Sequence, residues 1–173
     1  TGSGKSTIAN LVPRFYDVTE GSISIDGTDI RDMELHSLRS QLGYVPQKAV
    51  LFSGTIDSNL RYADKNATDE EILSGAQIAQ AMEFIESRPE GFETPIAQGG
   101  SNVSGGQKQR LSIARALVKK PQIYIFDDSF SALDFKTDSA LRAALRKETG
   151  GSTMLLIAQR ISTIMDAEQI IVL

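Results

Sequence analysis

Two glycine-rich segments of different kinds, far apart in the chain, constrain its fold more than any other feature. The first segment reads TGSGKST and is made up of Thr1, Gly2, Ser3, Gly4, Lys5, Ser6 and Thr7. The second reads SGGQ and is made up of Ser104, Gly105, Gly106 and Gln107. The first kind of segment joins a strand to a helix in an α/β fold and holds phosphate groups. One nucleotide needs one such loop, so the second segment predicts a site that is shared with another chain.

The first segment has the residues that a nucleotide triphosphate needs. Gly2 and Gly4 let the backbone come close enough for its N–H groups to point at phosphate oxygens. Lys5 meets the β- and γ-phosphates, and the Ser6 hydroxyl can ligate Mg²⁺. A flexible turn before a helix is the plainer alternative. We favour nucleotide binding, because Gly4-Lys5-Ser6-Thr7 opens a helical pattern as the motif requires.

Two further features add to this prediction. Asp127 and Asp128 follow the apolar run Ile123–Phe126. A carboxylate at a strand end can hold Mg²⁺, and its neighbour can orient the attacking water for in-line displacement. Ser104–Gln107 precede a helical stripe, so their N–H groups and the Ser104 hydroxyl form an anion site at the positive end of a helix. The sequence therefore predicts ATP and Mg²⁺ as ligands.

Composition limits the other possibilities. The chain has 173 residues, a length typical of one domain with a core of its own. Its net charge is −4 with scattered Lys and Arg, which argues against a nucleic-acid partner. There are no cysteines, so disulfides and thiolate metal sites are excluded. No apolar run approaches the roughly 18 residues that a membrane-spanning helix needs.

Both ends of the sequence suggest a fragment. The full phosphate-loop pattern starts with a glycine that would precede Thr1, as would the strand that feeds the loop. At the other end, Ile170–Leu173 is an apolar run that predicts a buried strand. We therefore expect the N-terminal strands to be missing, and any membrane role to belong to segments outside this sequence.

Local patterns predict most of the elements. Helices are expected at Lys5–Val12 and at Thr137–Lys147. A third should follow a capping box at Thr68–Glu71, and a fourth should follow the SGGQ segment, with the apolar stripe Leu111, Ala114, Leu117 and Val118. One helical stripe after the capping box runs through Ile72, Leu73, Ala76, Ala79 and Met82. Strands are expected at 22–25, which turns at Asp26-Gly27, and at Leu42–Val45, Ile123–Phe126 and Met154–Ile157. Strand and helix alternate at both ends around a mainly helical middle, which predicts an α/β core with a helical insertion.

Taken together, the ordered motifs resemble those of ATP-binding-cassette (ABC) transporters over essentially the whole chain. Val103–Arg110 resembles the signature motif, and Ser131–Asp134 resembles the D-loop that crosses the dimer interface. Gln47 matches the Q-loop glutamine, which touches Mg²⁺ or the attacking water and reports to the membrane domains. Similarity to the exporter branch lies in Leu51–Ile56 with Asn59, and in Ile25-Asp26-Gly27 with Asp29-Ile30-Arg31.

The resemblance implies a definite architecture. It is a P-loop NTPase core of the RecA-like α/β kind, with a mainly parallel sheet, an antiparallel β edge and a helical subdomain. Residues 1–173 would form one incomplete nucleotide-binding domain. The core is expected at about 1–48 and 116–173, and the helical subdomain at about 49–115.

Three positions depart from the family pattern. Asp128 stands where the family has its catalytic glutamate, Gln159 where the switch histidine is expected, and Gln98 where an acid usually lies before the signature. Asp is one methylene shorter than Glu, and a misplacement of about 1 Å can cost roughly 10²-fold in rate. Gln159 can donate a hydrogen bond to a γ-phosphate but cannot carry a proton. Each change alone is compatible with a tolerated sequence change. The changes at Asp128 and Gln159 together fall in one half-site, and they resemble the degenerate site of a heterodimeric exporter.

The predicted function is that of an ABC exporter's ATPase domain at the cytoplasmic face of a membrane. Its partners would be a second nucleotide-binding domain, in a heterodimer, and transmembrane domains outside this sequence. Asp128, Gln159 and Gln47 are the predicted catalytic residues, and Ser6, Gln47 and Asp127 the predicted metal-binding residues. One alternative is a soluble ABC ATPase of DNA repair or chromosome organisation, whose long coiled coil would lie between Gln47 and Ser104. Another is a regulatory ATP-binding subunit without turnover, which the intact Ser104–Gln107 segment disfavours.

Overall fold

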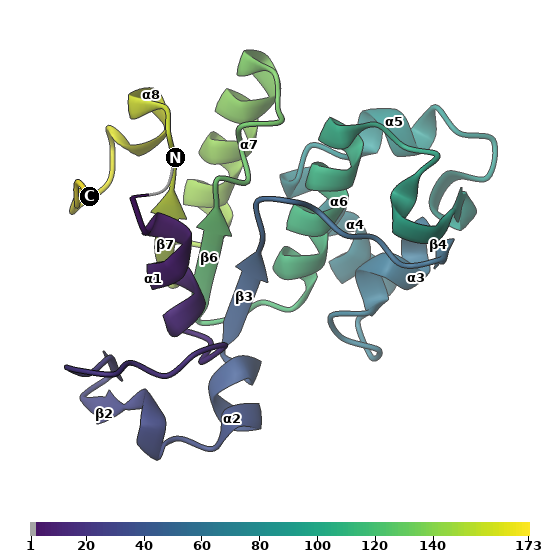
Figure 1. Cartoon of the computed structure of the whole chain (residues 1–173). Helices are drawn as coiled ribbons and strands as arrows, with labels where there is room; N and C mark the ends of the chain where they lie inside the picture. Colours follow the sequence, from purple (N-terminus) through teal and green to yellow (C-terminus); the bar gives the residue numbers. More distant parts are fainter. Residues whose placement is uncertain (1–2) are drawn as a thin grey trace.

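A parallel sheet of three strands lies at the centre of the structure, a computed structural model that describes residues 3–173. The strands are β3 (Leu42–Val45), β6 (Ile123–Asp127) and β7 (Thr153–Ile157), and their order in the sheet is β3-β6-β7 (Figure 1). Leu42 pairs with Ile123, which in turn pairs with Thr153. The continuous apolar runs in the sequence predicted such strands, since a parallel sheet is covered on both faces.

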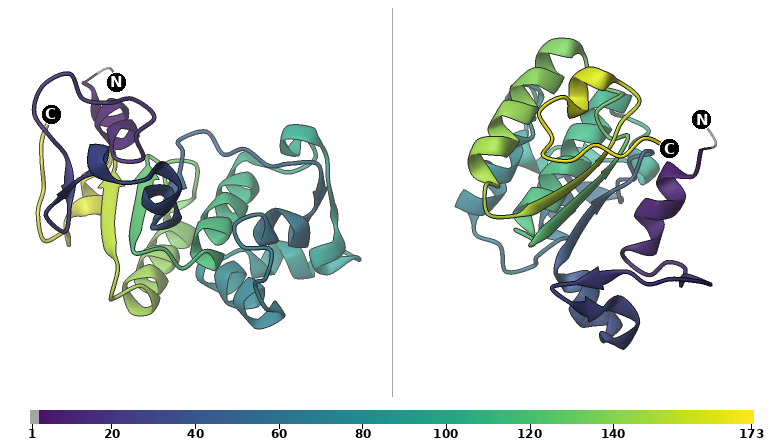
Figure 2. Two further views of the ribbon diagram at one scale, coloured as in Figure 1. Left: turned by 90° about the horizontal axis from the view of Figure 1, so that it is seen from below. Right: turned by 90° about the vertical axis from the view of Figure 1, so that its left-hand side faces the viewer.

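Helices cover the two faces of this sheet. The helix α1 (Lys5–Leu11) packs on one face against β6 and β7, while α7 (Phe135–Glu148) lies on the other face (Figure 2). Successive side chains of a strand point to opposite faces. Accordingly, Tyr124 and Phe126 of β6 stack near Phe130 on the α7 side, whereas Asp127 reaches α1. The predicted α/β class with a mainly parallel sheet is confirmed.

A short antiparallel hairpin and a helix lie next to β3. The strands β1 (Ser24–Ile25) and β2 (Thr28–Asp29) pair through a turn at Asp26 and Gly27, whose φ angles are 50° and 80°. Two consecutive positive φ angles are typical of the turn that joins two hairpin strands, and Asp and Gly are suited to it. The hairpin predicted at this place is therefore confirmed. It leads through a 3₁₀ turn at Ile30–Asp32 into α2 (Leu35–Ser40).

The middle of the chain is mainly helical. Its elements are β4 (Gly54–Thr55), α3 (Ile56–Arg61), α4 (Asp69–Ile78), α5 (Met82–Glu86), a 3₁₀ turn at Gly91–Glu93, β5 (Pro95–Ile96), a 3₁₀ turn at Gln98–Gly100, and α6 (Gly105–Val118). The predicted capping box is present, because Thr68 Oγ1 accepts from the Glu71 N–H and the Glu71 carboxylate accepts from the Thr68 N–H. None of the helices in the described part of the chain has the length and apolar composition to cross a bilayer.

Two predictions about elements were wrong. The single stripe from Ile72 to Met82 is split, because Gln80 has a left-handed backbone, φ 56°, that ends the hydrogen-bond ladder between α4 and α5. The predicted strand at Ile170–Leu173 is also absent. These four residues are 51–89% exposed and follow α8 (Ile161–Ile164) without pairing with a strand of the described sheet. A strand needs a neighbour for its backbone groups, and an apolar run alone does not supply one.

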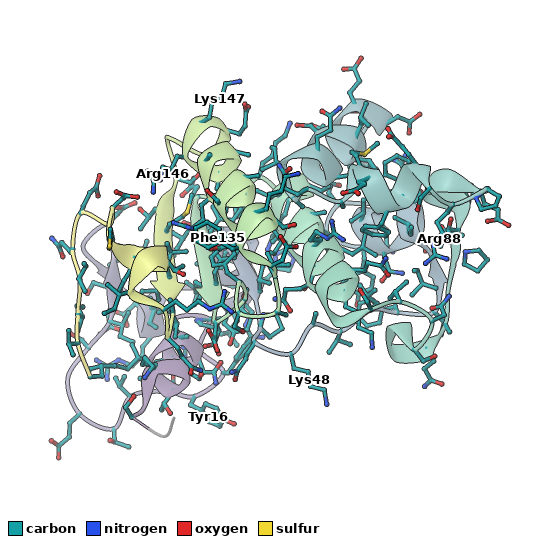
Figure 3. All side chains as sticks on the ribbon, turned by 90° about the horizontal axis from the view of Figure 1, so that it is seen from above. Tyr16, Lys48, Arg88, Phe135, Arg146 and Lys147 are labelled. Atoms are coloured by element: carbon teal, nitrogen blue, oxygen red, sulfur yellow. The ribbon has the colours of Figure 1, made fainter. Side chains whose placement is uncertain are left out.

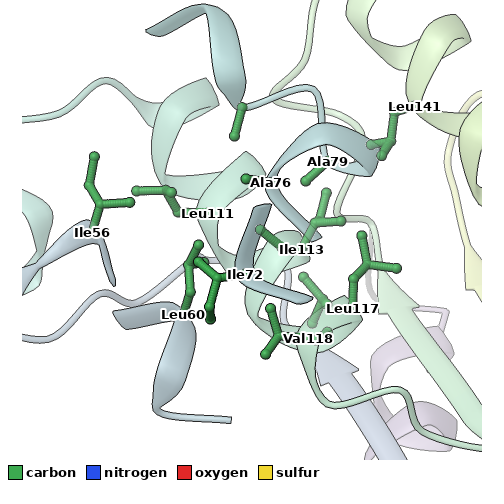
Figure 4. Close-up of a cluster of buried hydrophobic side chains, with 14 of the residues drawn as sticks. Ile56, Leu60, Ile72, Ala76, Ala79, Leu111, Ile113, Leu117, Val118 and Leu141 are labelled. Atoms are coloured by element: carbon green, nitrogen blue, oxygen red, sulfur yellow. The ribbon is translucent and has the colours of Figure 1, made fainter. Parts of the chain in front are cut away.

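The main core gathers around α6. This helix packs against α3 and α4 on one side and against β3 on the other. Figure 4 shows its Leu111, Ile113, Leu117 and Val118 among side chains of those helices and Leu141 of α7. The contact between α4 and α6 is very close at Gly75, where an added Cβ would lie 2.8 Å from Val118 Cγ2 and 3.2 Å from the Ala114 carbonyl oxygen. The helical middle and the sheet therefore share one core.

Replacing Gly75 by alanine tests this close packing. Gly75→Ala gains helix propensity but forces Val118 and the α6 backbone to move, and overpacking of a core typically costs about 1–3 kcal/mol. We expect a net destabilisation of about 1–2 kcal/mol in urea unfolding. Gly151→Ala is the matched control, since an added Cβ there meets no atom within 4 Å. If the two variants are equally stable, the α4–α6 contact is looser than the structure indicates.

Candidate functional site

The phosphate-loop segment forms the start of α1. Gly4 caps this helix with φ 91°, a left-handed conformation that a glycine adopts without the strain of a Cβ. Lys5 begins the helix, and its Nζ donates to Ser3 Oγ at 2.6 Å. Ser6 and Thr7 are exposed on the first turn. Thr1 and Gly2, which were also predicted to bind phosphate, lie outside the described residues.

Two of the three predicted metal-binding residues, Ser6 and Asp127, meet at the end of β6. Ser6 Oγ donates to Asp127 Oδ1 at 2.9 Å, across 121 positions of sequence. Asp127 is only 4% exposed, whereas Ser6 is open to solvent. A hydroxyl and a carboxylate are hard oxygen donors, and Mg²⁺ is usually held by one or two such groups together with substrate phosphates. The pair therefore fits a Mg²⁺–nucleotide complex. Among residues 3–173, no group of three or more His, Cys, Asp or Glu is suited to hold a metal ion.

The three predicted catalytic residues also come together. Asp128 Oδ2 accepts from Gln47 Nε2 at 3.1 Å and from Gln159 Nε2 at 2.8 Å. The two glutamines follow β3 and β7, the strands on either side of β6, and both are exposed. Asp128 itself is 7% exposed. The carboxyl ends of three parallel strands thus bring one carboxylate and two amides together beside Asp127.

The backbone of Asp128 has an unusual conformation. Its φ is 47°, in the left-handed region, which Asp tolerates better than most residues. The Asp128 N–H donates to the Ile157 carbonyl at 2.9 Å, and Ser131 Oγ donates to the Asp128 carbonyl at 2.8 Å. These bonds fix the turn between β6 and the Ser131–Asp134 segment. The side chain is thereby directed toward the two glutamines.

The second glycine-rich segment lies elsewhere on the surface. Ser104 caps α6 in a capping box: its Oγ accepts from the Gln107 N–H at 3.2 Å, and Gln107 Oε1 accepts from the Ser104 N–H at 3.0 Å. In Figures 1 and 2, α6 and α1 lie on different sides of the sheet. Ser104–Gln107 and Lys5–Ser6 therefore do not line one pocket within this chain. The Ser104 hydroxyl hydrogen remains available to an external acceptor.

Contacts connect the start of α6 to segments that adjoin the predicted catalytic residues. Gln109 of α6 is buried, and its Nε2 donates to the Pro46 carbonyl at 3.4 Å, one residue before Gln47. An added Cβ at Gly106 would lie 3.4 Å from the carbonyl oxygen of Ala132. Lys48, next to Gln47, extends away from the ribbon into solvent (Figure 3). Gln98, the third departure from the family pattern, is exposed at the start of its 3₁₀ turn.

Sequence reasoning missed two polar side chains beside Asp127. Tyr44 of β3 donates from its hydroxyl to Asn10 Oδ1 of α1 at 2.9 Å, and the same hydroxyl lies 3.5 Å from Asp127 Oδ2. Burial, the charge of Asp127 and this contact raise the pKa of Tyr44 to about 12. The available signal was a phenol within an apolar strand, because a buried hydroxyl normally needs a partner.

Comparison with known proteins was consistent with this geometry. A family profile described as ABC transporter matches residues 1–131. The ATP-dependent lipid A-core flippase of Syntrophus aciditrophicus is 47% identical over 173 residues, covering 100% of this chain and 29% of the flippase. The putative multidrug export ATP-binding/permease protein YgaD of Bacillus subtilis is 49% identical, covering 100% of this chain and 30% of that protein.

A solved structure agrees in both fold and sequence. The structure of a bacterial Atm1-family ABC exporter with ATP bound matches with a TM-score of 0.92 and 44% identity, over 96% of this chain and 29% of the exporter chain. This chain therefore spans about 30% of the length of the relatives that it matches. The agreement of profile, sequence and fold shows that the chain belongs to the ABC transporter family, as an ATP-binding domain of the exporter type.

Proposed function

We propose that this chain binds and hydrolyses Mg²⁺–ATP to power export of a substrate across a membrane. The observation that carries the proposal is the hydrogen bond between Ser6 Oγ and Asp127 Oδ1. It joins the helix that follows the phosphate loop to the acid at the end of the central strand. A hydroxyl and a carboxylate placed in this way are the oxygen donors that would hold Mg²⁺ beside the nucleotide phosphates.

Each residue of the site has a proposed task. Residues Thr1–Thr7 hold the phosphates through backbone N–H groups, with Lys5 at the β- and γ-phosphates. Ser6 and Asp127 would hold Mg²⁺, and Gln47 would reach the metal or the attacking water. When bound, the metal neutralises charge on the phosphate oxygens. Asp128 orients the water for in-line attack, and Gln159 donates a hydrogen bond toward the γ-phosphate.

We further propose that hydrolysis in this half-site is slow. Asp128 is shorter than the glutamate that the family resemblance leads one to expect, and its Oδ2 accepts from two amides. Gln159 cannot carry the proton or positive charge of a histidine. Lys5, Ser6 and Asp127 keep the residue types that the family pattern has, so ATP binding is expected to persist. Ground-state binding and transition-state stabilisation here depend on different residues.

The position of Ser104–Gln107 supports a partner. Because this segment lies away from the chain's own phosphate loop, we propose that it covers ATP bound to a second nucleotide-binding domain, whose signature covers ATP bound here. ATP binding closes this sandwich, and hydrolysis reopens it and moves the attached transmembrane domains. The partner is proposed to be a different chain with Glu and His at the positions of Asp128 and Gln159. The assembly would place this domain at the cytoplasmic face of the membrane, with no nucleic-acid partner.

The relatives favour this proposal over its alternatives. The two named relatives are described as a lipid A-core flippase and a putative multidrug exporter. A soluble ABC ATPase of DNA repair or chromosome organisation would have a long coiled coil between Gln47 and Ser104. The helices described there, α3, α4 and α5, have 6, 10 and 5 residues. A purely regulatory subunit would have no need of the capped Ser104–Gln107 segment, whose Ser104 and Gly105 are exposed.

The metal role of Asp127 has a direct test. Asp127→Asn in the complete protein removes a carboxylate that is proposed to hold Mg²⁺. We expect Mg²⁺-dependent ATP binding to weaken by at least about 10-fold, with little change in binding when EDTA is present. Asp17→Asn is the matched control, because it removes an exposed acid whose partner is Arg14. Unchanged Mg²⁺ dependence in Asp127→Asn, in both binding and turnover, would rule out this role.

The asymmetry of the half-sites is tested with two variants in the assembled transporter. Ser104→Ala is expected to reduce steady-state ATPase activity by about 100-fold, the loss typical of removing a donor to transition-state charge. Gly105→Asp is expected to act in the same direction. Asp128→Asn is expected to retain most of the turnover, because little hydrolysis passes through this residue.

The control for Ser104→Ala separates stability from activity. Thr68→Ala removes an equivalent capping box from α4, far from the proposed ATP sites. Loss of such a cap lowers the free energy of unfolding by about 1 kcal/mol. It should match the stability loss of Ser104→Ala and leave turnover intact. Collapse of activity in Asp128→Asn, to the level of Ser104→Ala, would mean that Asp128 is a working catalytic base and that the site is not degenerate.

A further inference from the structure

Two side chains on one face of α1 connect this helix to different strands of the sheet. Ser6 and Asn10 are four residues apart, so they lie one above the other on the same helix face. Ser6 Oγ donates to Asp127 Oδ1 of β6 at 2.9 Å, and Asn10 Oδ1 accepts from the Tyr44 hydroxyl of β3 at 2.9 Å. The helix that follows the phosphate loop is thus joined to β6 at one turn and to β3 at the next.

Sheet register places Tyr44 and Asp127 on the same face. Tyr44 is aligned with Ile125 in the parallel β3–β6 pair, and Asp127 follows Ile125 by two residues. Side chains two residues apart along a strand share a face. The Tyr44 hydroxyl accordingly lies 3.5 Å from Asp127 Oδ2, on the side of the carboxylate away from the Ser6 bond. The Tyr44 ring is fixed edge-on against Phe15, with centroids 5.6 Å apart.

We propose that Tyr44 is a positioning residue for the metal-binding carboxylate Asp127, acting through its hydroxyl on Oδ2. With Ser6 on Oδ1 and Tyr44 on Oδ2, rotation of the carboxylate about its Cβ–Cγ bond is restricted from both sides. The Oδ1 edge is then held toward Ser6, where Mg²⁺ is proposed to bind. This inference rests on the proposed function, because it assigns Tyr44 to the same Mg²⁺–ATP site. Partners of metal ligands set the ligand's orientation and commonly affect metal affinity.

A purely structural role for Tyr44 makes a different prediction. The hydroxyl has one hydrogen, for which Asn10 Oδ1 at 2.9 Å and Asp127 Oδ2 at 3.5 Å compete, and a hydroxyl that bonded only Asn10 would serve to hold α1 against β3. If so, removing Asn10 should be as harmful as removing the hydroxyl. If Tyr44 acts on Asp127, Asn10→Ala frees the hydrogen for Oδ2 and should preserve metal affinity. The two variants therefore separate the two roles.

The experiment measures metal binding without turnover. In the complete protein loaded with a non-hydrolysable ATP analogue, Mn²⁺ is titrated as a probe for Mg²⁺ and followed by its paramagnetic resonance signal. Tyr44→Phe keeps the ring against Phe15 and removes only the hydroxyl. We expect its Mn²⁺ dissociation constant to rise about 3- to 10-fold, a modest loss because 3.5 Å is a long contact. Binding of the analogue in EDTA should be the same in Tyr44→Phe as in the unmodified protein. Asn10→Ala and Tyr44→Phe should have equal melting temperatures, because both lose the hydrogen bond between Tyr44 and Asn10.

Tyr124→Phe is the matched control. It removes the same group from β6, but Tyr124 points to the opposite face and stacks on Phe126, with centroids 5.9 Å apart. Its Mn²⁺ affinity should equal that of the unmodified protein. Equal Mn²⁺ affinity in Tyr44→Phe and the unmodified protein would overturn the proposal, and so would equal losses in Tyr44→Phe and Asn10→Ala. If the unmodified protein binds no Mn²⁺ with the analogue, the proposed function itself fails, which is a distinguishable result.

Discussion

The pairing of β6 with strands on both sides is the constraint on which the rest of the structure depends. With β3 and β7 as neighbours, β6 must alternate its side chains between two covered faces. Tyr124 and Phe126 go to the α7 face, and Asp127 goes to the α1 face, where Ser6 meets it. The strand then ends, and a left-handed turn at Asp128 directs the next carboxylate between residues that follow the two flanking strands. Two adjacent acids thereby obtain different surroundings and different proposed tasks.

Local chemistry explains which parts of the fold could be predicted from the sequence. The capping box at Thr68–Glu71, the Asp26-Gly27 turn and the buried strands each depend on residues close in sequence, and the structure confirms them. The strand expected at 170–173 was wrong because pairing depends on a neighbour that the run itself does not specify. The break after α4 was missed because Gln80 has no sequence feature that requires a left-handed backbone.

The candidate site shows the same division. Lys5, Ser6, Asp127 and the Ser104–Gln107 segment belong to contiguous motifs, and so could be proposed directly from their spacing. The convergence of Gln47 and Gln159 on Asp128 followed from family resemblance, whereas the hydrogen bonds to Oδ2 required the structure. Tyr44 and Asn10 belong to no motif. Their contact with each other spans 34 positions and depends on how α1 packs on β3, which no local pattern encodes.

The shared core around α6 has a mechanical consequence. A helix of 14 residues is roughly 21 Å long and behaves as a rigid rod over that length. The C-terminal half of this rod is embedded among β3, α4 and α7, while Ser104 lies at its exposed tip. A tilt of about 10° at the embedded end displaces the tip by roughly 3.5 Å, which is more than a hydrogen bond can stretch. Small rotations in the packed interior are thus amplified at Ser104, on the surface that is proposed to cover a partner's nucleotide.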